Sequence, residues 1–215
     1  MIYIIGGPPR CGKTTLARRL SKKLNIGWLS GDTFEGIVRP YVSKEEYPRR
    51  FPKNILRETT NNTNDEMYTK YSVAEILDSY LVQGLVAQHA MEVLIEEMIK
   101  EKLDFILEGY HLYPEFVRKM MTKYGKNNFR VIFLVKDNYE VTLESLMASN
   151  LEDDWVHNKS NDKKIIKVIA KFILEFSKYY KNEANEYGLK VVKYTGNIDE
   201  FMQSAESILI KKENK

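Results

Sequence analysis

A glycine-rich segment near the amino terminus constrains this chain more than any other feature of its sequence. Residues 7–14 read Gly-Pro-Pro-Arg-Cys-Gly-Lys-Thr and fit the pattern G-x-x-x-x-G-K-[ST] of a phosphate-binding loop, or P-loop. The apolar residues 2–5 precede the loop and predict a short buried strand, and the amphipathic residues that follow it predict a helix. The motif therefore lies between a strand and a helix, which is the context that such a loop needs.

The residue types of the loop suit the binding of a nucleoside triphosphate. Its glycines permit backbone conformations in which successive N–H groups point at phosphate oxygens, and the helix adds the positive end of its dipole. We expect Lys13 to reach the terminal phosphates, the Thr14 hydroxyl to ligate Mg²⁺, and Lys13 to be exposed while the loop is empty. The nucleotide-binding residues expected from the loop are Gly7, Arg10, Cys11, Gly12, Lys13, Thr14 and Thr15.

Composition excludes several other classes of function. A chain of 215 residues is long enough for one sizeable α/β domain with insertions. The net charge of +3 is too small to indicate a nucleic-acid partner, and the basic residues form no stripe interleaved with aromatic residues. We find no apolar run of membrane-spanning length and no signal peptide, and the single cysteine, Cys11, fits a reducing cytoplasm. We therefore expect a cytoplasmic protein with a small-molecule substrate and without membrane or nucleic-acid partners.

Four further strands are predicted by short apolar runs, at residues 28–30, 103–107, 129–135 and 191–194, with helical patterns between them. Strands that alternate with helices predict a parallel sheet covered by helices on both faces. Because the carboxyl ends of parallel strands meet at one edge of the sheet, the P-loop should lie close to Asp32 and Glu108, which follow two of these strands. That convergence favours an active site over a module that only holds a nucleotide.

Asp32 and Glu108 each have two interpretations. Asp32 could touch the phosphate acceptor, or it could cap a helix beginning near Phe34, and one side chain could do both. A carboxylate at a crowded strand end is costly without a partner. Glu108 therefore fits a magnesium site, with a salt bridge to a lysine as the alternative. Tyr110 and His111 follow on the next loop and are candidates to contact the substrate, although a single histidine is weak evidence.

Residues 39–66 differ in composition from the rest of the chain, with several prolines and a polar stretch, and we interpret them as an insertion that leaves the core. A guanidinium group can clamp a phosphate or a carboxylate through its planar fork. We therefore expect at least one arginine of the insertion to bind substrate, although most surface arginines are merely solvated. The four candidates are Arg39, Arg49, Arg50 and Arg57.

Across almost its whole length, the chain resembles the nucleoside-monophosphate-kinase-like branch of the P-loop kinases. Residues 6–14 and 107–114 are further similar to the 2-phosphoglycerate kinase-like proteins. The resemblance implies a three-layer α/β/α P-loop NTPase fold with five parallel strands in the order 2-3-1-4-5. It also implies a single domain over residues 1–215, with a substrate-binding insertion at about 33–70 and a lid at about 150–163.

The resemblance also assigns roles to residues. Asp32 is placed like the acid that accepts the proton of the attacking hydroxyl, and Gly196 and Asn197 lie in a loop like the one that touches adenine through its backbone. Such kinases carry arginines in and before the lid, whereas this chain has none after Arg130. The cations near the expected lid are Lys159, Lys163 and Lys164, which lack the guanidinium fork. Unless the lid lysines suffice, Arg10 or an insertion arginine would have to supply the missing charge.

These observations predict a kinase that uses ATP and Mg²⁺ to phosphorylate a small, possibly anionic metabolite, with Lys13, Asp32 and Arg10 as its catalytic residues. Two alternatives remain at this point. The first is a nucleoside or nucleotide kinase, because a basic insertion suits a nucleotide acceptor as well. The second is a nucleotide-binding sensor with little transferase activity, which the arginine-poor lid favours.

Overall fold

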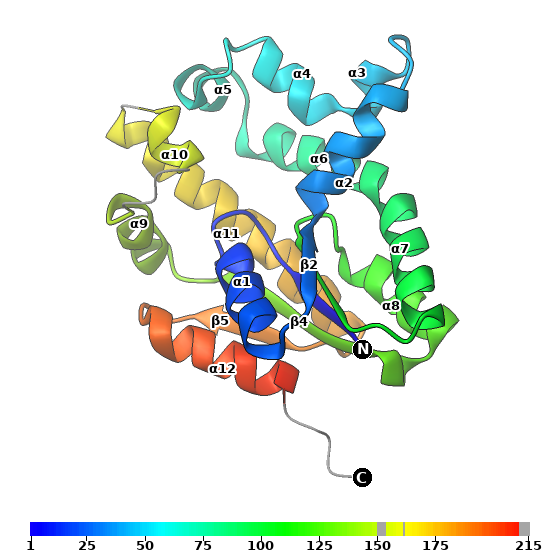
Figure 1. Ribbon diagram of the computed structural model, residues 1–215. Coiled ribbons are helices and arrows are strands. Elements are labelled where there is room, and N and C mark those ends of the chain that lie inside the picture. Colours follow the sequence, from blue (N-terminus) through cyan, green and yellow to red (C-terminus); the bar gives the residue numbers. More distant parts are fainter. Residues whose placement is uncertain (150–153, 161, 211–215) are drawn as a thin grey trace.

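The computed structural model describes residues 1–149, 154–160 and 162–210, and a five-stranded parallel sheet forms the centre of this part of the chain (Figure 1). The strand order is β2-β3-β1-β4-β5, which confirms the P-loop NTPase fold expected from the sequence. The strands are β1 (Ile2–Gly6), β2 (Gly27–Ser30), β3 (Phe105–Gly109), β4 (Phe129–Lys136) and β5 (Val191–Tyr194).

Helices cover both faces of the sheet, as the alternation of strands and helices predicted (Figure 1). On one face, α1 (Lys13–Leu24) and α12 (Ile198–Ile210) pack against the strands and against each other. On the other face, α7 (Gln88–Lys100) and α11 (Lys163–Glu186) contact the sheet, and α8 (Pro114–Tyr124) packs between them. The long helix α11 is amphipathic, and its buried stripe includes Ile169, Phe172, Phe176 and Tyr180.

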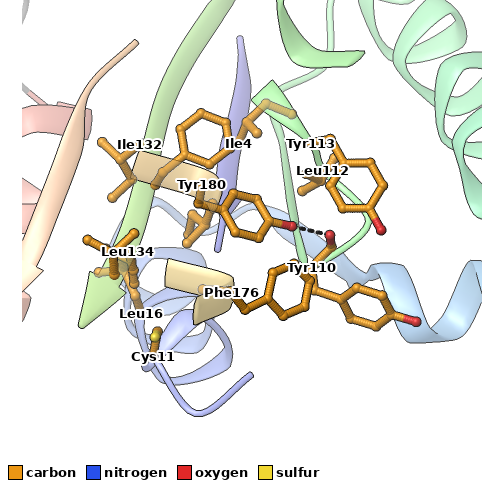
Figure 2. Packing of buried hydrophobic residues seen from close by; sticks show 14 of the residues in the cluster. Ile4, Cys11, Leu16, Tyr110, Leu112, Tyr113, Ile132, Leu134, Phe176 and Tyr180 are labelled. Carbon is orange, nitrogen blue, oxygen red and sulfur yellow. Dashed lines mark hydrogen bonds between the residues drawn. The ribbon is translucent and has the colours of Figure 1, made fainter. Parts of the chain in front are cut away.

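The hydrophobic core between α11 and the sheet also holds the loop that follows β3 at the carboxyl edge of the sheet. Figure 2 shows Phe176 and Tyr180 of α11 packed near Ile4 and Leu134 of the central strands. The buried Tyr180 hydroxyl donates a hydrogen bond to the backbone carbonyl of Tyr110. Since Tyr110 stands directly after β3, this contact anchors the β3–α8 loop to the core.

The insertion after β2 is largely helical and lies beyond the carboxyl edge of the sheet, in the upper part of Figure 1. It contains α2 (Gly31–Val38), α3 (Tyr47–Arg50), α4 (Pro52–Glu58) and α5 (Asn64–Lys70), and α6 (Val73–Gly84) follows it. Both α5 and α6 pack against α11. The remaining helices are α9 (Tyr139–Met147) and α10 (Trp155–Asn158), with 3-10 turns at Arg39–Tyr41, Leu85–Ala87 and Lys126–Asn128.

Two boundaries differ from the sequence expectation in ways that matter for the site. The helix expected near Phe34 begins at Gly31, because Ser30 supplies its cap. The third strand covers residues 105–109 instead of 103–107, so Glu108 lies within β3 and pairs in register with Ile5. Of the lid expected at 150–163, residues 150–153 and 161 lie outside the described residues. No helix in the described part of the chain is long and apolar enough to cross a bilayer.

Candidate active site

The P-loop connects β1 to α1 through backbone conformations that require glycine at two positions. Gly7 has a φ of 130°, and a Cβ atom there would lie 2.2 Å from the carbonyl oxygen of Leu134. Gly12 has a φ of 80° and caps α1, and a Cβ atom there would lie 2.6 Å from the Met202 side chain. The two glycines therefore allow the loop to approach β4 and α12 closely while it turns into the helix.

Lys13 is buried, with 8% of its surface exposed, so the expectation of an exposed Lys13 is wrong. Its Nζ atom donates a hydrogen bond of 2.7 Å to the backbone carbonyl oxygen of Pro8. The carbonyl within the same loop thus satisfies the ammonium group, which would otherwise need solvent. This contact holds the cation inside the P-loop, where phosphate oxygens would have to compete with the Pro8 carbonyl for it.

Thr14 and Glu108, the two expected ligands of Mg²⁺, lie next to each other. The Thr14 hydroxyl donates to Glu108 Oε1 over 2.9 Å, and Glu108 is only 2% exposed. The hydrogen-bond partner of this buried carboxylate is therefore a hydroxyl from the P-loop, in place of the lysine that the alternative interpretation required. A carboxylate and a hydroxyl side by side fit a small, hard cation that takes oxygen ligands and keeps several waters.

Asp32 lies in the first turn of α2, and its side chain is exposed. The cap of this helix is Ser30, whose Oγ accepts a hydrogen bond of 3.2 Å from the backbone N–H of Asp32. The interpretation of Asp32 as the helix cap is therefore wrong, because the residue two positions earlier performs that role. A carboxylate in the first turn is stabilised by the helix dipole.

A cavity of about 240 Å³ opens beside the P-loop and contains Asp32 in its wall. Its lining joins the P-loop, the insertion, α6, the β3–α8 loop and the segment around α10. We call it the acceptor cavity after the role proposed for it below, and the residues that line it are Pro9, Asp32, Lys53, Arg57, Tyr80, Tyr110, Trp155 and Lys159. One carboxylate therefore shares a metabolite-sized space with three cations and three aromatic rings.

The four candidate arginines of the insertion have different positions in the structure. Arg57 lines the acceptor cavity, whereas Arg49 and Arg50 form surface ion pairs with Glu46, at 3.2 Å and 3.6 Å. Arg39 is exposed and does not belong to the cavity lining. Arg49 and Arg50 lie on the short helix α3, and their guanidinium groups pair with Glu46, the residue just before this helix.

Tyr110 and His111, both expected to contact the substrate, have different positions. Tyr110 lines the acceptor cavity, but His111 is fully buried and its Nε2 atom lies 3.0 Å from Glu35 Oε2. The His111 ring packs so closely on the start of α2 that a Cβ atom on Gly31 would lie 2.2 Å from its Nδ1. His111 therefore supports the wall behind the cavity, which corrects its assignment as a substrate contact.

Glu35 was missed in the sequence, and it organises the base of the acceptor cavity. It accepts hydrogen bonds from Gln83 Nε2 at 2.6 Å and from the Tyr110 hydroxyl at 2.6 Å, and it pairs with Lys53 Nζ at 3.1 Å. Burial alone would raise the pKa of Glu35, but the contacts with His111, Lys53 and Tyr110 outweigh it and hold that pKa at about 2. The one available signal was its spacing of three residues from Asp32, which places both carboxylates on neighbouring positions of one helix.

Because the pKa of Glu35 is lowered in the folded protein, we predict that the free energy of unfolding depends on pH through this residue. The ionised carboxylate stabilises the fold above pH 4.5, and this stabilisation should be lost as the pH falls from 4.5 towards 2. The whole effect corresponds to about 3 kcal/mol in the free energy of unfolding. We expect Glu35→Gln to be less stable than the wild type at pH 7 and to lose less stability between pH 5 and pH 3.

Denaturant unfolding at a series of pH values measures this difference. Glu97→Gln is the matched control, because it removes an exposed carboxylate whose partner Lys100 lies 3.7 Å away. The control should follow the pH dependence of the wild type. Equal pH dependence in Glu35→Gln and the wild type would show that Glu35 is not held ionised by its neighbours.

Comparison with known proteins gives relatives at low identity. No family model matches the chain. The chain is 23% identical to the 2-phosphoglycerate kinase of Pyrococcus furiosus over 90% of its own length and 59% of that protein. It is also 23% identical to the adenylate kinase of Rickettsia africae, over 87% of its own length and 90% of that enzyme. The curated 2-phosphoglycerate kinases that it matches are longer, and the chain spans between 38% and 61% of them.

A solved structure has a fold similar to that of this chain. The gluconokinase of Sinorhizobium meliloti 1021 matches 96% of this chain and 90% of its own, with a TM-score of 0.51 and 12% identity. The sheet order gives the chain the P-loop NTPase fold, and most of its length is similar to enzymes named as kinases. The expected lid lies between β4 and β5, and the loop after β5 is the one expected to border the base of the nucleotide.

The P-loop contacts the described part of the expected lid and the residue just before that segment. Arg10 of the P-loop donates to Ser149 Oγ over 2.8 Å, and its guanidinium lies 3.0 Å from the buried carboxylate of Asp154. Burial lowers the pKa of Arg10, and the Asp154 charge opposes that effect. Of the expected lid cations, Lys159 lines the acceptor cavity, whereas Lys163 and Lys164 are exposed in the first turn of α11 and lie outside its lining.

The expected adenine loop connects β5 to α12. Gly196 has a φ of 108°, and its carbonyl oxygen accepts a hydrogen bond of 3.0 Å from the Tyr194 hydroxyl. Asn197 Oδ1 accepts from the backbone N–H groups of Asp199 and Glu200, at 3.0 Å and 3.2 Å, and so caps α12. Because the Asn197 side chain serves the helix, a contact with adenine from this loop would use backbone groups.

Proposed function

We propose that the chain is an ATP-dependent kinase that transfers the γ-phosphoryl group to a hydroxyl of a small anionic metabolite. The observation that carries this proposal is the acceptor cavity beside the P-loop, in which the Asp32 carboxylate faces the same space as three cations. A carboxylate suits the hydroxyl that attacks, and the cations suit a phosphate or carboxylate elsewhere on the acceptor.

The chemistry assigns one task to each group. The acceptor oxygen forms a bond to the γ-phosphorus, the bond to the leaving oxygen of ADP breaks, and the hydroxyl proton passes to Asp32. Lys13 stabilises the charge of the transferred group, since phosphoryl transfer needs mainly positioning and electrostatic stabilisation. Thr14 and Glu108 would hold Mg²⁺, which neutralises charge on the triphosphate when it is bound.

The distribution of charge around the cavity supports an anionic acceptor. Glu35 neutralises Lys53 at the base of the cavity. Within the described residues, Arg57 and Lys159 form no salt bridge with a carboxylate. Two cations therefore remain available on the side of the cavity that faces α10. A phosphoglycerate, with a hydroxyl, a phosphate and a carboxylate, has the chemistry that this arrangement would recognise.

A nucleotide acceptor is the second candidate, because the chain is similar to an adenylate kinase over 87% of its length. The size of the cavity favours the smaller acceptor. Its volume of about 240 Å³ lies below the range of about 300 to 1,000 Å³ typical of sites for larger ligands.

The experiment that tests the proposal is a screen for ADP release that depends on an acceptor. The panel contains 2-phosphoglycerate, related hydroxy acids and their phosphates, AMP and other nucleoside monophosphates, with ATP and Mg²⁺ in every reaction. The proposal expects a small phosphorylated or carboxylated hydroxy compound to be the best acceptor. A preference for AMP would establish the nucleotide kinase, and ADP release that no compound increases would favour the sensor.

Arg57 offers a test of the acceptor side once an acceptor is found. We expect Arg57→Ala to raise the KM for the acceptor about 10- to 100-fold, because a charge-assisted hydrogen bond contributes about 1.5 to 3 kcal/mol. The KM for ATP should change little. Arg49→Ala removes a guanidinium that is paired with Glu46 on the surface and should keep the KM for the acceptor near that of the wild type. Equal effects of the two substitutions would remove Arg57 from the acceptor site.

A further inference from the structure

Asn64 joins the insertion to the lid through an unusually complete set of hydrogen bonds. It is the first residue of α5 and is fully buried, with 0% of its surface exposed. Its Oδ1 atom accepts from Arg57 Nη1 over 2.6 Å, and its Nδ2 atom donates to the backbone carbonyls of Trp155 and Val156, at 2.9 Å and 3.2 Å. Its backbone N–H donates to the carbonyl of Lys159 over 2.7 Å.

These contacts fix two walls of the acceptor cavity relative to each other. Arg57 comes from α4, whereas Trp155 and Lys159 come from the segment of residues 154–160, which we call the α10 segment. The Arg57 guanidinium also lies 5.6 Å from the centre of the Trp155 ring, and the Ser160 hydroxyl donates to Asp65. Loss of the Asn64 side chain would leave a half-buried guanidinium and two carbonyls without this partner, which is costly.

We propose that Asn64 is a positioning residue of the acceptor site, which holds Arg57 and Lys159 on one side of the cavity so that both bind the same anionic group. This inference rests on the proposed function, in which the acceptor is anionic. The two like charges repel each other, so an arrangement that keeps them together has to be imposed by other contacts. Asn64 imposes it. Its side-chain amide binds the Arg57 guanidinium and two backbone carbonyls of the α10 segment, and its backbone N–H binds the carbonyl of Lys159 in the same segment.

The protonation behaviour of Lys159 agrees with this arrangement. Burial lowers the pKa of Lys159, and the charge of Arg57 lowers it further. Burial and Arg57 both disfavour the charged form of Lys159, and a bound anion beside the ammonium group would favour that form again. The site therefore gains an acceptor group with at least one negative charge and oxygen atoms that reach both a guanidinium and an ammonium.

The first test uses fluorescence and no substrate. In a Trp28→Phe background, Trp155 is the only tryptophan and reports on the α10 segment. Asn64→Asp keeps an oxygen for Arg57 but places a carboxylate oxygen against the carbonyls of Trp155 and Val156, so the α10 segment should be released. We expect the quenching of Trp155 by acrylamide to increase about twofold or more. Asn61→Gly is the matched control, since it removes an exposed amide that donates hydrogen bonds to Glu66 in the same insertion.

The second test measures anion binding with the P-loop filled. Inorganic phosphate is titrated into the protein saturated with a non-hydrolysable ATP analogue and Mg²⁺, and Trp155 emission is followed. We expect Asn64→Asp and Lys159→Ala each to weaken phosphate binding about 10-fold. The loss in the double variant should be smaller than the product of the two single losses, because release of the α10 segment already removes Lys159 from the site.

Several results would overturn the inference. Unchanged quenching of Trp155 in Asn64→Asp, additive losses in the double variant, or the same losses in Asn61→Gly would each do so. Wild-type protein that binds no phosphate beside the nucleotide analogue would also contradict it. If Asn64→Asp does not fold, as judged by circular dichroism, Asn64→Ser takes its place with the same expected results. These readouts need no phosphoryl transfer, so a failure to find a kinase acceptor would count against the proposed function and not against Asn64.

Discussion

Asp32→Asn is expected to lower acceptor-dependent turnover about 10²- to 10⁴-fold, which corresponds to about 3 to 5 kcal/mol in the activation barrier. The amide has the size of the carboxylate but cannot accept the proton of the attacking hydroxyl. ATP affinity should stay near that of the wild type, because Thr14 and Glu108 are the groups assigned to the metal. The folded protein should tolerate the change, since Ser30 and not Asp32 caps α2. Steady-state kinetics and ATP binding measure both quantities.

Asp199→Asn is a matched control for this prediction. Asp199 is also the second residue of its helix, is exposed, and follows a polar cap in the same way. The control should keep its turnover. Near-normal turnover in Asp32→Asn would exclude Asp32 as the base, whereas loss of ATP binding would mean that Asp32 serves the metal in place of Glu108.

The second large effect is expected for Lys13→Ala. In the wild type, ATP with Mg²⁺ at a hundred times its dissociation constant should stabilise the fold by about 2.7 kcal/mol. Lys13→Ala should remove most of this gain, because the ammonium group held inside the P-loop is the charge assigned to the terminal phosphates. The free protein should remain folded, since the Lys13 ammonium makes its hydrogen bond within the loop, to Pro8. Thermal melts with and without nucleotide measure the shift.

Lys22→Ala serves as the control, because Lys22 is exposed near the end of the same helix. It should retain the nucleotide-induced shift of the wild type. An unchanged shift in Lys13→Ala would count against the assignment of Lys13. A Lys13→Ala protein that is unfolded without nucleotide would instead show that the contact with Pro8 is structural.

Local sequence patterns were sufficient to predict the fold and the position of the P-loop beside Glu108. The P-loop has a fixed spacing, and each strand is a short apolar run, so the strand order followed from the resemblance and the alternation of elements. Thr14 and Glu108 could be paired in advance, because the P-loop that leads to Thr14 follows β1, and Glu108 lies near the carboxyl end of the neighbouring parallel strand β3. The same argument predicted that Asp32 lies close to the P-loop, and Asp32 lines one cavity together with Pro9 of that loop.

The acceptor side depends on contacts between distant segments, and these leave no periodic signal in one sequence. Gln83 is a polar residue on α6 that is nevertheless fully buried, because Glu35 and Asn54 accept hydrogen bonds from its side-chain amide. Lys53 resembles any surface lysine of the insertion until the fold brings it to Glu35. Arg57 could not be separated from the other arginines, because only the packing of α4, α5 and α10 places it in the cavity.

The central claim is that the chain moves a phosphoryl group from ATP to a small anionic acceptor, and label transfer tests it most directly. The protein is incubated with Mg²⁺, ATP labelled in the γ-phosphate and the best compound of the acceptor screen, and the label is then located. We expect the label in the acceptor, at a rate that falls about 10²-fold or more in Asp32→Asn. Label that appears only as inorganic phosphate, at a rate independent of the acceptor, would contradict the claim.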